Sequence, residues 1–309
     1  MNPQFIRVGV VLLLGLVSFV LTLGAVARLV RKKPIGRVGL AGLVVFGAGV
    51  LAFLWGVLIE ADWLEVTRHT LQTSKWPKGK TLRIAHFSDL HVDRDSRALS
   101  RLAVELADAK PDLIVFTGDS LNDASALKLF RTTLGSMNAR LGRAAVRGNH
   151  DTYRWKQLDL FGGGVAMELT RGPVVLEDGL LTLCGAAFNA YEALPDCIAG
   201  APKGSFVVLA YHTPDLVEVI DPRPDLYLAG HTHGGQVAVP FYGALLTFSR
   251  YDKKYESGWY EVEGTTLNVS RGIGFEPRYP RVRFAARPEL SIVDIEGTAP
   301  PQADPPNPG

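Results

Sequence analysis

The sequence contains little cysteine, and several common catalytic motifs are absent from it. Its two cysteines, Cys184 and Cys197, are too few for a disulfide framework, and they either pair or remain as two separate buried thiols. No Walker-type lysine loop, His-Glu-X-X-His helix or Cys-X-X-Cys pair occurs. These absences argue against a P-loop nucleotide site and against zinc sites built from one short segment.

Charge is absent from two long stretches near the N-terminus. Residues 8–27 form a run of 20 uncharged residues, and residues 38–59 form a second run of 22. Each run can cross a hydrocarbon core of roughly 30 Å as a helix that rises about 1.5 Å per residue. Neither run has the polar face of a helix packed in a soluble domain, and the first is long for a signal peptide. We therefore predict a transmembrane hairpin over residues 1–60, with helices at about 8–27 and 38–59.

Basic residues gather in the short loop between the two runs. This loop contains Arg28, Arg31, Lys32, Lys33 and Arg37. Because basic loops stay on the cytoplasmic side of a membrane, the N-terminus and everything after the second helix should face outward. The loop therefore predicts a multi-pass protein of the cell (inner) membrane whose main domain lies on the outer, periplasmic or extracellular, face.

The rest of the chain lacks a basic tract. Residues 1–59 hold six of the 33 Lys and Arg residues and none of the 31 Asp and Glu residues, so the remainder is slightly acidic. A nucleic-acid partner is not expected for such a surface. The membrane bilayer is the partner that the composition predicts.

Short apolar strands alternate with helical patterns after a connector at residues 61–80, which contains at most a first strand. The expected domain spans 81–297, and a Pro-rich tail at 298–309 is expected to be disordered. Its first half alternates strands with helices, which favours a sheet with helices on both faces. The expected elements of this half are Leu82–Phe87, Arg97–Ala109, Asp112–Thr117, Ala124–Met137 and Arg143–Val146. The strands expected in the second half are Gly179–Cys184, Ser205–Tyr211, Asp225–Ala229, Tyr255–Val262, Thr265–Val269 and Glu289–Ile295.

Polar clusters follow five of these expected strands. The clusters contain Asp89 and His91, then Asp119, then Asn149, His150 and Asp151, then His212, and finally His231 and His233. In α/β sheets ligands bind beyond the carboxyl ends of strands, so these side chains should meet. Five of the seven histidines fall in the clusters. Carboxylates, an amide oxygen and neutral imidazoles suit divalent Mn, Fe, Zn or Co.

The order of these motifs resembles the calcineurin-like metallophosphoesterase superfamily. The motifs are Asp-X-His, Gly-Asp, Gly-Asn-His-Asp, His and Gly-His-X-His, and the match runs from about Arg83 to Ile295. The resemblance implies an α/β fold, a four-layer α/β/β/α sandwich preceded by the transmembrane hairpin. The segments around Gly230–Gln236, Val269–Gly274 and Arg283–Glu289 are similar to a membrane-anchored bacterial branch that includes UDP-2,3-diacylglucosamine pyrophosphatases of lipid A synthesis.

The resemblance also implies a role for each site residue. One divalent ion would be held by Asp89, His91, Asp119 and His233, and a second by Asp119, Asn149, His212 and His231. His150 would protonate the leaving oxygen, with Asp151 orienting it. Members often carry an acidic residue where this chain has Asn122. Arg271, Arg281 and Arg283 are either phosphate contacts or solvated surface residues.

The implied function is hydrolysis of a phosphodiester or pyrophosphate by a water that two metal ions activate. Membrane anchoring favours an amphiphilic, lipid-linked or cell-envelope substrate. A UDP-diacylglucosamine-like substrate would lie on the cytoplasmic side, whereas the basic loop predicts an outward domain. The alternative is a non-catalytic, metal-stabilised membrane binding protein, which would be expected to lack a metal ligand or the acid.

Overall fold

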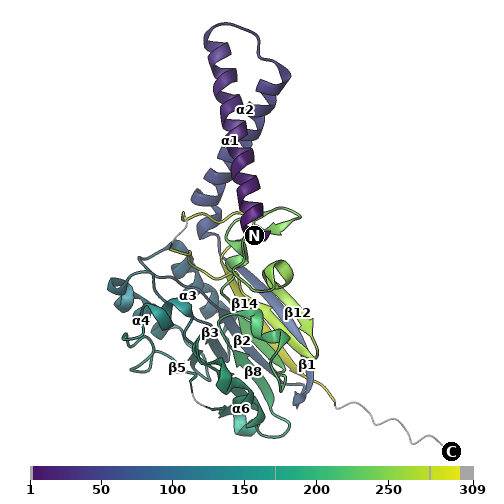
Figure 1. Cartoon of the computed structure of the whole chain (residues 1–309). Helices are drawn as coiled ribbons and strands as arrows, with labels where there is room; N and C mark the ends of the chain where they lie inside the picture. The colour runs from purple at the N-terminus through teal and green to yellow at the C-terminus, as the bar shows by residue number, and fades with distance from the viewer. Residues whose placement is uncertain (1–2, 171, 278–279, 300–309) are drawn as a thin grey trace, which may run out of the picture.

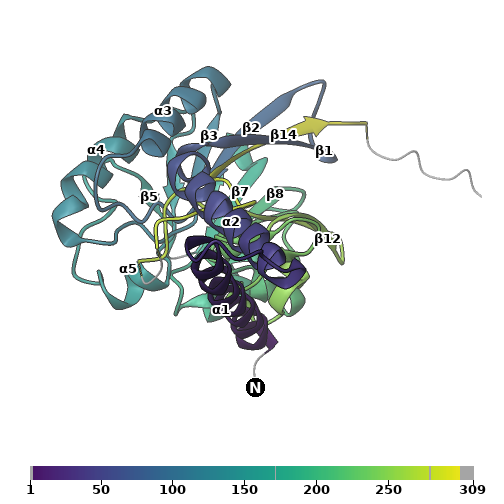
Figure 2. The ribbon, with the colours of Figure 1, turned by 90° about the horizontal axis from the view of Figure 1, so that it is seen from above.

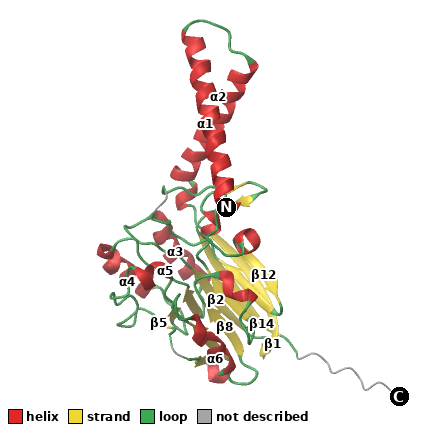
Figure 3. Ribbon diagram, in the orientation of Figure 1, coloured by secondary structure: helices red, strands yellow, loops and turns green. Residues whose placement is uncertain are grey.

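Two six-stranded sheets lie face to face in the computed structural model, which describes residues 3–170, 172–277 and 280–299 (Figures 1 and 3). The strand orders are β1-β14-β2-β3-β4-β5 and β12-β13-β9-β8-β7-β6. The first sheet contains β1 (Glu65–Lys78), β2 (Thr81–Phe87), β3 (Leu113–Phe116), β4 (Arg143–Ala145), β5 (Met167–Glu168) and β14 (Glu289–Gly297). The second contains β6 (Val174–Leu176), β7 (Leu181–Gly185), β8 (Phe206–Ala210), β9 (Leu226–Ala229), β12 (Gly258–Val262) and β13 (Thr265–Val269).

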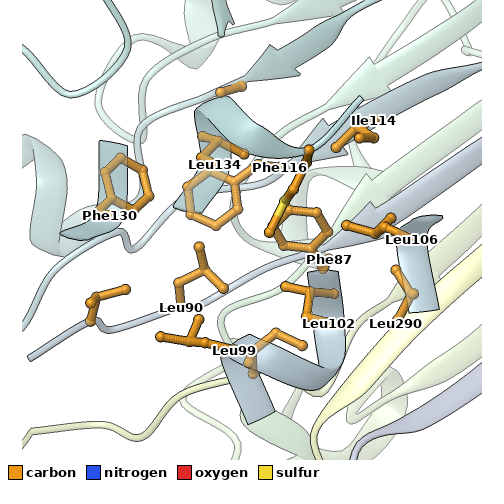
Figure 4. Close-up of a cluster of buried hydrophobic side chains, with 14 of the residues drawn as sticks. Phe87, Leu90, Leu99, Leu102, Leu106, Ile114, Phe116, Phe130, Leu134 and Leu290 are labelled. Carbon is orange, nitrogen blue, oxygen red and sulfur yellow. The ribbon is translucent and has the colours of Figure 1, made fainter. Parts of the chain in front are cut away.

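Each sheet buries one face against the other sheet and one face against helices, because its strands are apolar on both sides. In β2, Leu82 and Ile84 face the second sheet, whereas Ala85 and Phe87 face α3 (Arg97–Ala109) and α4 (Leu127–Ser136). Figure 4 shows this outer cluster, in which the ring centroids of Phe87 and Phe116 lie 5.6 Å apart. On the far face of the second sheet, α6 (Leu194–Ala199) and η5 (Pro214–Glu218) supply a third cluster.

These layers confirm the four-layer α/β/β/α sandwich, whereas the expectation of one sheet with helices on both faces is wrong. The inner face of the first sheet is covered by strands from the second half of the chain rather than by helices. The alternation of strands and helices could not show this, because it reports neighbours in sequence only.

Residues 61–80 contribute the edge of the first sheet instead of serving mainly as a connector. After the short turn η1 (Glu60–Asp62), the 14-residue strand β1 pairs in parallel with β14 over the whole length of that strand. Polar and charged side chains along β1 concealed its length in the sequence. The tail predicted over 298–309 lies outside the described residues except for its first two.

The two uncharged runs form an antiparallel hairpin that projects from one end of the sandwich (Figures 1 and 2). The helices are α1 (Pro3–Val30) and α2 (Arg37–Leu58), and both are long and apolar enough to cross a membrane. Gly42 lets them approach closely, since a Cβ there would lie 2.5 Å from Cβ of Leu21. The rings of Phe19 and Phe46 pack nearby at 5.4 Å.

Cys184 and Cys197, whose pairing the sequence left open, form a disulfide that ties β7 to α6. Their Cα atoms lie 5.9 Å apart, within the usual range for a disulfide, and both residues are buried. The bond therefore fastens the outer helix to the second sheet.

Candidate metal centre

The five predicted clusters meet at the carboxyl ends of neighbouring strands. Strands β2, β3 and β4 pair in parallel within the first sheet, and β8 and β9 do so within the second. The loops that follow them therefore leave both sheets at one edge of the sandwich. Gly118, with φ of 96°, lets two of these loops approach closely, since a Cβ there would lie 2.3 Å from the nitrogen of Gly148.

The backbone of this site is held in an uncommon conformation. Left-handed φ angles occur at five of the predicted metal ligands, namely Asp89, His91, Asp119, His231 and His233. For residues other than glycine such angles cost of order 1–3 kcal/mol each and persist only where surrounding structure imposes them. Their concentration here indicates that the loops are shaped for ligand geometry.

One group of donors gathers around Asp89. Oδ1 of Asp89 lies 3.4 Å from Nε2 of His233 and 4.0 Å from Nε2 of His91. All three residues are buried, and their ligand atoms lie within 4.8 Å of one another. Neither Oδ1 of Asp89 nor Nε2 of His91 has a hydrogen-bond partner among the described residues. Orphaned buried acceptors are costly, and a cation between them would satisfy both.

A second group gathers around His212. Its Nε2 lies 2.9 Å from Oδ1 of Asn149, 3.2 Å from Nδ1 of His231 and 3.5 Å from Oδ2 of Asp119. The same Oδ2 of Asp119 lies 3.5 Å from Nε2 of His91, in the first group. Asp119 thus stands between the two groups, where a bridging carboxylate would have to be. The donor set fits two adjacent divalent ions.

Hydrogen bonds behind the donors fix which ring nitrogen faces the site. Nδ1 of His91 lies 2.8 Å from Oδ1 of Asn122, and Nδ1 of His212 lies 2.8 Å from the carbonyl oxygen of Thr117. Each Nδ1–H donates to its oxygen, so each Nε2 is the nitrogen that faces the site. Asn122 also donates to the carbonyl oxygen of Phe275, which holds its amide in this orientation.

The protonation states of three donors suit cation binding, whereas His212 would have to give up a proton to the solvent. Burial lowers the pKa of His212, but the charge and hydrogen bond of Asp119 raise it to about 9. Burial, reinforced by the charge of His212, lowers the pKa of His231 to about 3, and burial lowers the pKa of His233 well below its ordinary value. Both rings are therefore neutral. Burial alone would raise the pKa of Asp119, but the charge and hydrogen bond of His212 lower it. Asp119 is thus ionised, and the site offers negative charge to a cation.

His150 reaches the edge of this centre and contacts a carboxylate that the sequence did not indicate. Its backbone N–H donates to Oδ1 of Asp119 at 2.8 Å, and its Nε2 lies 3.3 Å from Oε2 of Glu276. Burial works against a protonated ring, but the hydrogen bond with Glu276 and the charge of Asp119 raise the pKa of His150. The ring is therefore suited to give up a proton near neutral pH.

Asp151, which was expected to orient His150, directs its carboxylate toward backbone N–H groups. Its Oδ2 accepts hydrogen bonds from the backbone N–H groups of Asp119 and Gly148, and its Oδ1 accepts one from Ser120. The carboxylate faces the backbone because Gly148 is the N-cap residue of α5 (Asn149–Tyr153), and Asp151 in the first turn accepts the N–H of Gly148. Asp151 therefore positions the loop that carries Asp119.

The three arginines weighed as phosphate contacts have internal partners. Arg283 is fully buried and donates to the carbonyl oxygens of Gly274 and Ala286. Arg271 pairs with Glu65 at 2.7 Å, and Arg281 pairs with Asp93 at 2.6 Å. These contacts assign them to holding the loops of the centre in place.

A cleft of about 330 Å³ opens above the donors, and aromatic side chains form part of it. It is lined by Asp119, Asn149, Tyr153, Phe188, His231, Phe248 and Glu276. Phe188 is one of these aromatic residues, and its ring is tilted toward the ring of His231 at 6.3 Å. Glu276 could not be found from the sequence, because it lies in a loop away from any strand end.

The sequence is similar to those of known phosphoesterases. The model of the calcineurin-like phosphoesterase family matches residues 82–235. The uncharacterized metallophosphoesterase YkuE of Bacillus subtilis is 32% identical over 84% of this chain and 93% of its own length. Phosphodiesterase YaeI of Escherichia coli is 28% identical over 76% of this chain and 90% of its own. UDP-2,3-diacylglucosamine pyrophosphatase LpxG of Chlamydia muridarum is 24% identical over 81% of this chain and 94% of its own length.

Proposed function

Because this chain belongs to the calcineurin-like phosphoesterase family, we propose that it is a membrane-anchored hydrolase of phosphodiester or pyrophosphate bonds in amphiphilic substrates. The observation that carries the proposal is the position of Asp119, whose Oδ2 lies 3.5 Å from a histidine of each donor group. A carboxylate shared in this way serves a pair of divalent ions.

The donors divide into two sets around that carboxylate. Asp89, His91 and His233 would hold one ion together with Asp119, and Asn149, His212 and His231 would hold the other with it. Bound there, two divalent ions supply Lewis acidity toward the phosphoryl oxygens and lower the pKa of water. The chain orients these ligands through Asn122, Thr117 and Asp151.

His150 supplies the proton that the departing oxygen needs. Its raised pKa keeps part of the rings protonated near neutral pH, and Glu276 fixes the direction of Nε2. Protonation of a poor leaving group is worth roughly 10²–10⁴-fold in rate. His150 lies beside Asp119, so the proton is delivered next to the place where the phosphoryl group would bind.

The amphiphilic nature of the substrate is supported by the anchor. The start of α1 lines a cavity together with His233, and the end of α2 contacts the domain through a hydrogen bond from Arg283 to Gly56. LpxG, one of the relatives, is a UDP-2,3-diacylglucosamine pyrophosphatase. A site fixed at a bilayer surface meets lipid phosphoesters at high local concentration. We propose a lipid-linked pyrophosphate or an envelope phosphodiester as the substrate class.

We propose that the catalytic domain faces outward as a multi-pass protein of the cell (inner) membrane. The basic loop between α1 and α2 supports this orientation, and so does the disulfide of Cys184 and Cys197, since disulfides persist in oxidising compartments. A C-terminal alkaline phosphatase fusion should be active. An inactive fusion with full expression would place the domain in the cytoplasm instead.

Hydrolysis of bis-p-nitrophenyl phosphate by the full chain in detergent tests the activity. The protein is stripped of metal and refilled with Mn or Zn, beside Asp119→Asn and the surface control Asp108→Asn. We expect metal-dependent turnover that Asp119→Asn reduces by about 10³-fold or more, together with loss of metal, because the shared ligand is missing. A folded protein that binds two ions but hydrolyses neither this ester nor lipid pyrophosphates would be a binding protein.

A further inference from the structure

An apolar cavity of about 300 Å³ separates the beginning of α1 from the catalytic domain. One wall belongs to the predicted membrane span and includes Val8, Val11 and Leu12. The opposite wall belongs to the domain and includes Leu246 and Val282. The cavity is therefore bounded by a helix in lipid on one side and by the folded domain on the other.

Polar contacts hold the α1 wall in place. Oε1 of Gln4 accepts a hydrogen bond from the N–H of Thr247 at 2.9 Å, and Gln4 donates to the carbonyl oxygen of Ser249. One turn later, Arg7 pairs with Asp252 at 2.8 Å. These bonds join segments far apart in the chain, so α1 is docked as a component of the domain and not only tethered to it.

The cavity adjoins the metal centre. His233, a donor of the first group, lines it, and Phe248 and Glu276 line both this cavity and the cleft above the donors. A molecule could therefore place a polar group at the donors and an apolar segment between α1 and the domain. Phe248 and Glu276 would stand at the junction of the two parts.

The same end of the domain carries other apolar groups that suit a bilayer. The tip between β10 (Ala238–Val239) and β11 (Gly243–Ala244) presents Phe241, which is fully exposed, and the half-exposed Tyr242. Trp55 and Trp63, at the end of α2 and after it, are also exposed. Aromatic side chains of this kind lie at the level of lipid headgroups. The cavity, with one wall on the predicted span, therefore lies at the end of the domain that suits the membrane interface.

We propose that this cavity is a subsite for an alkyl chain of the substrate and that α1 is part of the active site as well as an anchor. This subsite rests on the proposed function, and it would select lipid phosphoesters by binding one of their alkyl chains. The phosphoryl group occupies the cleft, and one chain lies between Val8 and Leu246. Each methylene buried there strengthens binding roughly fourfold.

The test measures how chain length affects turnover by the full protein in lipid nanodiscs. The substrates are methyl, octyl and hexadecyl esters of p-nitrophenyl phosphate, which share one leaving group. Val8→Trp and Leu246→Trp fill the cavity from opposite walls, and Leu14→Trp places the same ring on an exposed position of α1 outside the lining. In the wild type, kcat/KM should rise with chain length.

Both filling variants should lower kcat/KM for the hexadecyl ester by at least about tenfold, since excluding about two methylenes suffices for that loss. Both variants should lose much less kcat/KM for the methyl ester than for the hexadecyl ester, and Leu14→Trp should behave as the wild type. A flat dependence on chain length, or an unchanged preference in both variants, would overturn the subsite. Equal loss of the two esters in both variants would also overturn it. No metal-dependent hydrolysis of the methyl ester by the wild type would instead refute the proposed function.

Discussion

Oε2 of Glu276 lies 3.3 Å from Nε2 of His150, and this contact helps to raise the pKa of the imidazole despite its burial. An acid works while it is protonated, so activity should fall as the pH rises through the pKa of His150. Replacing Glu276 with Gln removes the charge that favours the protonated ring. The alkaline limb of the pH–rate profile should therefore move to lower pH in Glu276→Gln.

The pH profile is best measured with a dialkyl phosphodiester, whose leaving group needs a proton. Metal content should be unchanged, because Glu276 belongs to neither donor group. Glu192→Gln, at an exposed position, is the matched control. An alkaline limb at the same pH in Glu276→Gln and the wild type would show that this carboxylate does not act on His150.

His150→Ala separates acid catalysis from metal binding. Its rate on a dialkyl phosphodiester should fall by roughly 10²–10⁴-fold, whereas bis-p-nitrophenyl phosphate, whose leaving group departs without a proton, should lose much less. Metal content measured by elemental analysis should stay at the wild-type level. His69→Ala, at a histidine stacked on Trp259 away from the site, is the control. Loss of metal with full activity after reconstitution would refute the assignment.

Asn122→Ala tests the residue that departs from the family pattern. Its Oδ1 accepts the Nδ1–H of His91, and losing such an outer contact costs about 10–100-fold in metal affinity. We expect that loss in competition against a chelator, with kcat recovered at saturating metal. Asn138→Ala, on the surface, should bind metal as the wild type does. Unchanged affinity would mean that His91 needs no such support.

The donor clusters could be predicted because strand ends are local signals. Asp89, His91 and Asp119 directly follow apolar strands, and the topology brings such ends together. Glu276 could not be predicted, because it reaches His150 through a loop whose path depends on Arg283 and on backbone contacts. The docking of α1 was hidden for the same reason, since Gln4 meets Thr247 only in the folded chain.

The layers of the fold were predicted by resemblance and not by periodicity. Strand β2 is buried on both faces, which is equally compatible with helices or with a second sheet on its inner side. Local patterns also misjudged β1, whose charged and polar residues look like a connector although the strand pairs with β14. Pairing between distant segments leaves no periodic signal in either one.

Asp151→Asn distinguishes a positioning role from an orienting one. The carboxylate accepts three backbone N–H bonds, and an amide can accept fewer and would turn its NH₂ toward donors. Each buried donor left unsatisfied costs about 1–3 kcal/mol, so thermal unfolding should occur at a markedly lower temperature and metal affinity should fall. An exposed control, Asp108→Asn, should do neither. If Asp151 oriented His150 instead, the variant would keep its stability and its metals. It would then lose proton transfer to the leaving group, and its rate on a dialkyl phosphodiester would fall.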